Sequence, residues 1–437
     1  MDSSNNEKII MKTQILPFIK LAGALLFSTF LLLSCSKEDS LGKEDNPEEP
    51  AVEPLQLVIT ASTTDIDEGE EVVFTTQADG ENIDADIFVN STKISGKKHL
   101  FEETGVYKVK AKKDGYTDSE EIEVKVYKID VHVAGNGQGG KVMYWKNDEV
   151  SYWTSGAKKA YVNGMDIEGE DVYIVGHEID GDDNVPMYWK NGTAHILSGR
   201  SPHSDATSIA VDNGDVYVSG YTHKDLNFHG RYWKNGEGKS LPDFQPKDIA
   251  VSKGKVHLVG NGAHPDSPNS VVMYWYDNQF YTMKTDVFVG SGTSIFVQGE
   301  DVYIAGTETH YVDGRNKNFA KYWKNGKEVV FPYEKDQFVV HMSIFVDGQD
   351  VHVAGRIDNS KGYGRVHYWK NGEESVLTDD RIQSNAYKVF VYNGDAYIAG
   401  SEDRKACYWK NGVKIELEDA IDYTYAESIY VSRSLKE

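Results

Sequence analysis

The sequence predicts an all-β protein whose larger part is a β-propeller of seven blades, and two observations carry this prediction. The motif Tyr-Trp-Lys-Asn-Gly and its close variants return along the chain, with 40 to 48 residues between successive tryptophans. Short apolar strands joined by tight turns fill each interval, and this combination is typical of propeller blades. The seven repeated tryptophans are Trp145, Trp189, Trp233, Trp275, Trp323, Trp369 and Trp409.

One repeat, residues 208–241, shows the predicted strands most clearly. Ser208-Ile209-Ala210-Val211 and Asp215-Val216-Tyr217-Val218 flank Asn213-Gly214, and a second Asn-Gly follows Trp233. Asn-Gly between apolar runs favours a hairpin, because both turn residues adopt positive φ at little cost. The repeat therefore predicts four antiparallel strands.

The two ends of the repeat region predict that the ring closes on itself. The first repeat begins at its second strand, 130–135, with no Ser-Ile-x-Val strand before it. The missing strand occurs at the other end of the chain, as Ser428-Ile429-Tyr430-Val431. Pairing of these segments would complete the first blade and leave no open sheet edge.

The first 54 residues are predicted to lie outside the folded part. In residues 1–35, Lys12 and Lys20 precede the apolar run 21–33, which suits a signal peptide and is too short to span a bilayer. The run ends at Ser34-Cys35, which resembles the lipobox of bacterial lipoproteins, so Cys35 is the predicted lipid attachment site. A plain signal peptide with a chance cysteine is the alternative.

Residues 36–54 are rich in carboxylates and proline, which predicts an extended, disordered acidic linker. Its opening Ser-Lys-Glu-Asp resembles the signal that exports lipoproteins to the outer surface of certain Gram-negative bacteria. That resemblance implies a lipid-anchored protein of the outer membrane that faces the cell exterior; a simple solvated tether is the alternative.

Residues 55–128 lack the repeat and predict a small β-sandwich. Five alternating segments are expected to be strands, at 57–60, 72–75, 86–89, 106–109 and 122–126. This pattern resembles immunoglobulin-like domains of bacterial surface lipoproteins, with Tyr107 where such domains often carry a corner tyrosine. The propeller is then expected to occupy residues 129–437. Its repeats resemble those of bacterial lipoproteins whose propellers carry Tyr-Trp-Lys-Asn-Gly and, more distantly, kelch and YVTN-type propellers.

Residues that recur in most repeats are interpreted as structural, because a binding or active site in a ring would break the symmetry. The aspartate that opens six of the seven second strands is expected to hydrogen-bond in the turns. His132, His257 and His352 alternate with tyrosines at one position and are expected to be packed rings. Cys407 is expected to be a packed side chain. No cofactor and no metal are predicted.

The variable connections at one rim of the propeller are the predicted binding surface, since loops on a rigid scaffold commonly carry function. The candidate residues of this rim are Asp180, Asp182, His203, His223, His229, His264, His310, Tyr311, Tyr363 and Tyr423. The run 180–184 also resembles the start of a calcium loop, but Val185 replaces the glycine needed for the sharp turn, so a solvated acidic loop is preferred.

The sequence favours a non-enzymatic, surface-displayed monomer that binds a glycan or a cell-envelope or extracellular protein. Two alternatives remain open: a polysaccharide lyase or glycoside hydrolase, and a passive scaffold or adhesion module. Contact with the membrane is expected only through the N-terminal lipid. A net charge of -23 argues against nucleic acid as a partner, because phosphates would be repelled.

Overall fold

The computed structural model describes residues 53–435, apart from 225–226, 265–266, 284–288, 313, 332–337 and 360. The predicted signal peptide, Cys35 and almost all of the predicted linker lie outside the described residues. The segment Pro54–Glu437 forms a compact unit. Its regular elements are strands throughout the described part, where no helix is long and apolar enough to cross a bilayer.

The N-terminal part of this unit consists of two small sheets around one core. One sheet holds β1 (Val58–Ala61), β3 (Glu70–Ala78), β4 (Glu81–Asn82) and β7 (Lys98–Phe101). The other holds β2 (Asp65–Asp67), β5 (Asp86–Val89), β6 (Thr92–Lys93), β8 (Gly105–Lys112) and the start of β9 (Ile122–Gly137). Buried apolar side chains of both sheets, Phe74 and Val124 among them, pack into one cluster.

All five predicted sandwich segments lie in or overlap strands, whereas the short strands β2, β4, β6 and β7 escaped prediction because they have too few residues to show an alternating pattern. The Tyr107 hydroxyl donates a 2.9 Å hydrogen bond to the carbonyl of Glu103. This is the contact expected of a corner tyrosine.

The strand β9 joins the two parts of the unit without a break. Its first residues pair with β8, and its later residues pair with β10 (Lys141–Lys146) of the first repeat. The predicted domain boundary after Lys128 therefore falls inside one continuous strand. The Asp67 carboxylate adds a second connection, because it accepts hydrogen bonds from Tyr392 at 3.3 Å and Asn393 at 2.6 Å.

The repeats form six four-stranded antiparallel sheets, each with its strands in sequence order. The first three are β12 (Ala160–Glu168), β13 (Asp171–Asp180), β14 (Asp183–Lys190), β15 (Thr193–Ile196); β16 (Asp205–Asp212), β17 (Asp215–Lys224), β18 (Asn227–Lys234), β19 (Glu237–Leu241); and β20 (Phe244–Ser252), β21 (Lys255–His264), β22 (Ser267–Tyr276), β23 (Gln279–Thr282). The last three are β24 (Val289–Gln298), β25 (Asp301–Val312), β26 (Arg315–Lys324), β27 (Lys327–Val330); β28 (Phe338–Asp347), β29 (Asp350–Asp358), β30 (Gly364–Lys370), β31 (Glu373–Val376); and β32 (Ser384–Tyr392), β33 (Asp395–Glu402), β34 (Lys405–Lys410), β35 (Val413–Glu416).

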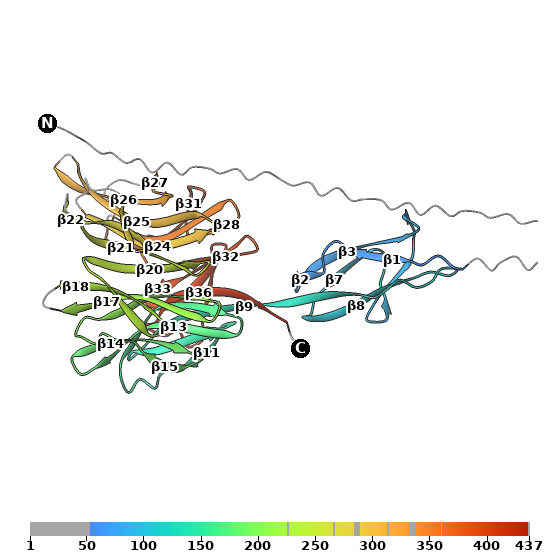
Figure 1. The fold of residues 1–437 in the computed structure, drawn as a ribbon, viewed down its shortest axis with the longest axis horizontal. Coiled ribbons are helices and arrows are strands. Elements are labelled where there is room, and N and C mark those ends of the chain that lie inside the picture. Colours follow the sequence, from blue (N-terminus) through green and yellow to red (C-terminus); the bar gives the residue numbers. More distant parts are fainter. Residues whose placement is uncertain are drawn as a thin grey trace, which may run out of the picture. The chain divides into compact units, whose positions relative to one another are not determined.

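The last strand of the chain, β36 (Tyr425–Ser434), pairs antiparallel with β9, as Figure 1 shows. Ile429 lies opposite Val133, and β10 and β11 (Glu149–Tyr152) continue the sheet on the other side of β9. The innermost strand of each sheet contacts that of the next, and β36 contacts both β32 and β12. The predicted pairing of the two chain ends is confirmed.

The repeated motif Tyr-Trp-Lys-Asn-Gly is explained by one set of contacts that recurs in most sheets. In the turn after β30, the Asn371 side chain accepts a hydrogen bond from the Val351 amide at 2.9 Å and donates one to Asp350 at 2.8 Å. Lys370 forms an ion pair with the other oxygen of Asp350 at 2.9 Å. We call this arrangement the turn clasp. The same clasp is formed by Asn147, Asn191, Asn235, Asn325 and Asn411.

The aromatic residues of the motif have the packing roles predicted for them. All seven repeated tryptophans are buried, with exposed fractions of 5% or less. The rings of His132, His257 and His352 are buried, and each accepts or donates a hydrogen bond to a tyrosine hydroxyl at 2.6 to 2.7 Å. Cys407 is buried among apolar side chains, and burial raises the pKa of its thiol to about 12.

Replacing Asn371 with alanine is expected to destabilise the protein by about 1–2 kcal/mol more than replacing Asn213, because only Asn371 forms a turn clasp. The two positions are matched, since both have a φ of 53° and both follow a strand. Among the described residues, the Asn213 side chain bonds only to the neighbouring Asp212. Urea unfolding of N371A and N213A tests this, and equal losses of stability would contradict the role of the clasp.

Candidate functional site

A cavity of about 780 Å³ runs between the innermost strands of the ring. Residues of β12, β16, β20, β24, β28, β32 and β36 all line it, so it is the central channel of the fold. It is therefore a single asymmetric site to which seven similar strands each contribute different side chains.

A β-bulge in each innermost strand decides which side chains enter the channel. Six of these strands shift register at one equivalent point, opposite a glycine of the second strand, and β28 shifts slightly earlier. At Gly400, a Cβ would collide with the carbonyl oxygen of Asn385, so the close approach requires glycine. A bulge redirects the extra residue. The seven extra residues all line the channel, and they are Asn163, Thr207, Lys247, Thr293, Val340, Tyr387 and Glu427.

A serine at one equivalent position, directly after the bulge in β24 and three residues after it in β28, ties neighbouring sheets together. The hydroxyl of Ser294 accepts a hydrogen bond from the Ile344 amide at 3.3 Å, and that of Ser343 accepts one from the Val389 amide at 3.1 Å. Three sheets depart from serine at this position, with Gly164, Asp248 and Lys388. The two charged departures mark where the channel is specialised.

Asp248 and Lys388 come from different sheets and meet in the channel. The Asp248 carboxylate accepts hydrogen bonds from the Ser208 hydroxyl at 2.6 Å and from the amides of Ile249 and Ile295 at 3.0 and 2.9 Å. The Lys388 ammonium lies 3.8 Å from the same carboxylate. Because three donors already hold this carboxylate, Asp248 has a structural role as well as a charge.

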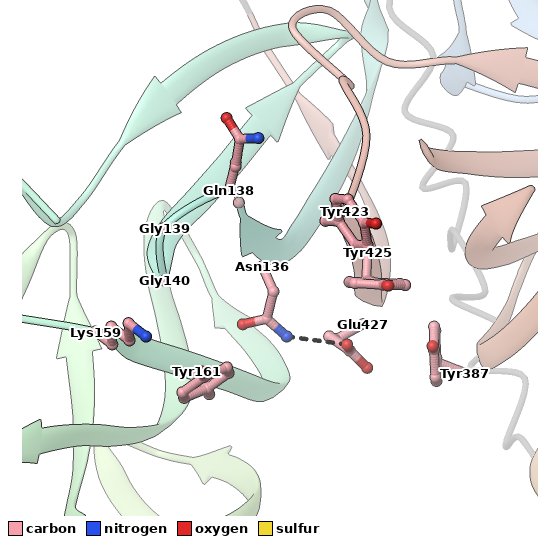
Figure 2. A pocket seen from close by; sticks show the side chains of 11 residues that line it. Asn136, Gln138, Gly139, Gly140, Lys159, Tyr161, Tyr387, Tyr423, Tyr425 and Glu427 are labelled. Atoms are coloured by element: carbon pink, nitrogen blue, oxygen red, sulfur yellow. Dashed lines mark hydrogen bonds between the residues drawn. The ribbon is translucent and has the colours of Figure 1, made fainter. Parts of the chain in front are cut away.

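A second cavity, of about 520 Å³, adjoins the channel and shares Tyr387 and Glu427 with it. Figure 2 shows Tyr387, Tyr423 and Tyr425 on one side of Glu427, with Tyr161 beyond Asn136 on the other. The β9–β10 turn, 137–140, and Lys159 complete the lining. We call this cavity the tyrosine pocket.

The base of the tyrosine pocket is a hydrogen-bonded pair of polar side chains. The Asn136 side chain donates to Glu427 at 2.9 Å and accepts from the Val162 amide at 2.7 Å. Asn136 comes from β9 and Glu427 from β36, so the pair exists only because these strands lie side by side. The pocket thus combines tyrosine rings with a carboxyl, an amide and an exposed lysine.

Burial changes the acidity of the carboxyls that face the channel. It raises the pKa of Glu427 to about 7, although the hydrogen bond from Asn136 works in the opposite direction. It also raises the pKa of Asp166 to about 6, against hydrogen bonds from the amides of Val211 and Ile167. Two carboxyls in this channel are therefore largely protonated in mildly acidic solution.

The rim that the sequence predicted consists mainly of hairpins rather than irregular loops, so that part of the prediction was wrong. The strand β25 continues to Val312 and pairs with β26 up to Arg315. The extensions of β13, β17 and β21 pair in the same way. Backbone pairing thus continues outward along these connections.

The predicted rim residues are spread around the ring, and among those described only Tyr423 lines the tyrosine pocket. The rings of His203 and His223 meet at 5.2 Å, and His310 contacts Glu308 at 3.1 Å. The other predicted residues lie apart from these. Asp180 pairs with Lys158 and Arg200, and Asp182 and Tyr363 are exposed in connections between strands. His229 is in β18, Tyr311 is 69% exposed in β25, and the side chain of His264 is outside the described part.

The acidic run tested as a calcium loop is held by a cation. Arg200 forms ion pairs with Asp180 at 2.9 Å and with Asp183 at 2.8 Å. In the described part of the chain, no group of three acidic, histidine or cysteine side chains has the arrangement of a metal site.

Sequence reasoning missed the channel residues because it looked for variation only in the connections between strands. The signal was available in the Ser-Ile-x-Val strand itself. Ser208, Ser294, Ser343 and Ser428 stand where Gly164, Asp248 and Lys388 occur in the other three repeats. A charged residue in place of serine on an innermost strand was the feature that could have located the channel.

No known protein family matches this sequence, and no curated protein matches it. Solved structures to which the chain is similar include a puromycin-hydrolyzing peptidase of Mycobacterium tuberculosis, at 10% identity and a TM-score of 0.41, covering 60% of this chain and 47% of the peptidase. TolB from Acinetobacter baumannii follows at 10% and 0.35, covering 74% and 80%. A thermostable family-43 glycoside hydrolase matches at 9% and 0.31, covering 53% and 89%. The chain thus spans about half the peptidase, and likenesses this distant carry no conclusion about activity or ligand.

Replacing Glu427 with glutamine is expected to stabilise the protein more at pH 8 than at pH 5. The folded-state pKa of about 7 lies above the ordinary value of 4.5, so the stability that this carboxyl contributes at low pH is lost as pH rises through about 7. The difference between the two pH values should be roughly 1–3 kcal/mol. Urea unfolding of both proteins measures it, and an offset independent of pH would contradict the burial of an ionisable carboxyl.

Proposed function

We propose that this chain is a non-enzymatic binding protein that holds a glycan in the tyrosine pocket at the mouth of the central channel. The observation that carries the proposal is the grouping of Tyr161, Tyr387, Tyr423 and Tyr425 around the pair Asn136–Glu427. Tyrosine offers an apolar face for a sugar ring and a hydroxyl for its polar edge. The amide and carboxyl supply the convergent polar groups that fix a ligand's orientation.

The hydrogen bonding of the channel carboxyls supports binding over hydrolysis. Asp248 accepts three hydrogen bonds, Asp166 accepts two from backbone amides, and Asp205 contacts His177 at 2.7 Å. A glycosidase needs two carboxyls at a separation suited to its chemistry, one of them available as acid. Glu427, with one hydrogen bond from Asn136, is the carboxyl most available to a ligand.

We further propose that the four strands β36, β9, β10 and β11 act as the seventh blade of the propeller. The pairing order is that of a blade whose innermost strand comes from the end of the chain. On this proposal the N-terminal sheets are an immunoglobulin-like spacer. Asp67 contacts Asn393 in the β32–β33 turn, and the residues that line the tyrosine pocket begin at Asn136, which supports a role outside the pocket.

The lipobox-like sequence at Cys35 supports a proposed location at the outer membrane, with the propeller facing the exterior. Incorporation of labelled fatty acid into the intact chain, and its loss in the variant C35A, would support the anchor. Equal labelling of both chains would exclude Cys35 as the attachment site.

Glycan binding is tested with a chain that starts at Ser36 and so contains the compact unit Pro54–Glu437. Screening against bacterial and host glycans should identify ligands that are retained without release of reducing sugar. Tyr161→Ala or Tyr425→Ala should weaken binding about tenfold or more, because each removes a stacking surface and a hydroxyl.

Tyr311→Ala is the matched control, because this tyrosine is 69% exposed and is not among the residues that line either described cavity. Its affinity should equal that of the wild type. Product release would favour the enzyme alternative, and capture of a protein without any glycan would favour the protein ligand. Equal affinity of all four chains would remove the tyrosine pocket from the proposal.

A further inference from the structure

The channel contains a lysine for which no ion-pair partner is found among the described residues. Lys247 is the extra residue in the bulge of β20, which places it on the channel wall. Among the described residues its only close charged or aromatic contact is the ring of Tyr221, 5.6 Å from its ammonium. Desolvation lowers the pKa of Lys247, and Asp205 opposes that shift only in part. An ammonium group in such a place is stabilised by an anion that enters from outside.

Lys247 shares the channel with a second lysine, Lys388, and with four carboxyl-bearing residues, Asp166, Asp205, Asp248 and Glu427. The pKa of His341 is lowered by burial, and both Lys247 and Lys388 lower it further through their charges. Lys247 of β20 and Lys388 of β32 therefore both lie within electrostatic reach of His341 on β28. The one carboxylate that acts on His341 with them is Asp248, which already accepts three hydrogen bonds.

The other acidic groups near these lysines also have partners. Asp205, which acts on Lys247, accepts hydrogen bonds from Asn163 at 2.8 Å and His177 at 2.7 Å. Asp166, which feels the charge of Lys388, is held by two backbone amides. A bound anion could therefore pair with Lys247 without displacing a described carboxylate from a direct ion pair with this lysine.

The part of the channel around Lys247 is continuous with the tyrosine pocket. Tyr387 and Glu427 line both cavities, and His341 bonds to the carbonyl of Tyr387 at 3.0 Å. A ligand held by the tyrosines can extend past these residues into the channel.

We infer that Lys247 forms a subsite for a carboxylate of the ligand, and that the glycan class bound is an acidic one bearing uronic acid residues. The glycan in this inference rests on the proposed function, and the negative charge of the ligand rests on the position of the Lys247 ammonium in the channel. On this account the tyrosine pocket holds a sugar ring, and the Lys247 ammonium pairs with the carboxylate of a residue that reaches into the channel.

The test compares uronic acid oligosaccharides with the same oligosaccharides after reduction of their carboxyls to alcohols. Titration calorimetry of the chain from Ser36 should show the acidic form binding about tenfold or more tightly. Lys247→Gln should abolish this preference and leave the affinity for the reduced form unchanged. Lys239→Gln is the matched control, because Lys239 also lies over an aromatic ring, that of Trp275 at 5.3 Å, and does not line the channel.

Equal binding of the acidic and reduced forms by the wild type would overturn the inference, as would a preference that survives in K247Q. Free glucuronate at millimolar concentration provides a second measurement that does not depend on the tyrosine pocket. NMR of the lysine ammonium and side-chain signals should show a shift assigned to Lys247. If no oligosaccharide binds, the proposed glycan function fails, and the glucuronate titration then decides the subsite alone: a shift at Lys247 supports it, and no shift overturns it.

Discussion

The pairing of β36 with β9 is the contact on which the rest of this structure depends. It joins residues about 300 positions apart in the chain, and the Ile429 side chain is buried in the cluster that contains Val133 and Trp145. Without it, β9 and β32 would each present an open face at the ends of a row of sheets. Such open ends carry unpaired backbone groups and exposed apolar surface, both of which are costly.

The same pairing assembles the candidate site. Asn136 and Glu427, which form the base of the tyrosine pocket, are contributed by the two paired strands. Tyr425 lies directly opposite Asn136 in the strand register. The same strand pairing therefore closes the ring and forms the pocket. The bulge at Glu427 places this side chain on the channel wall.

Much of this fold could be predicted from the sequence, because the repeated residues serve purposes that recur in each sheet. The turn clasp needs an asparagine and an aspartate at the positions of Asn371 and Asp350 in each sheet that forms it, so their spacing is visible as a motif. The site could not be predicted in the same way. Lys247 and Glu427 reach the channel because of a register shift between strands, and a register shift depends on backbone packing against a glycine such as Gly400 rather than on the bulged residue itself.

Native-state hydrogen exchange of the β36 amides tests the closure most directly. If β36 completes the ring, the amides of Ile429 and Val431 should exchange only through global unfolding, with the same free energy as the Val389 amide in β32. The exposed edge strand β35 should exchange faster and serves as the internal reference. Exchange of β36 well ahead of β32, while the other sheets stay protected, would show that the ring is open in solution and would contradict both the closure and the pocket that it builds.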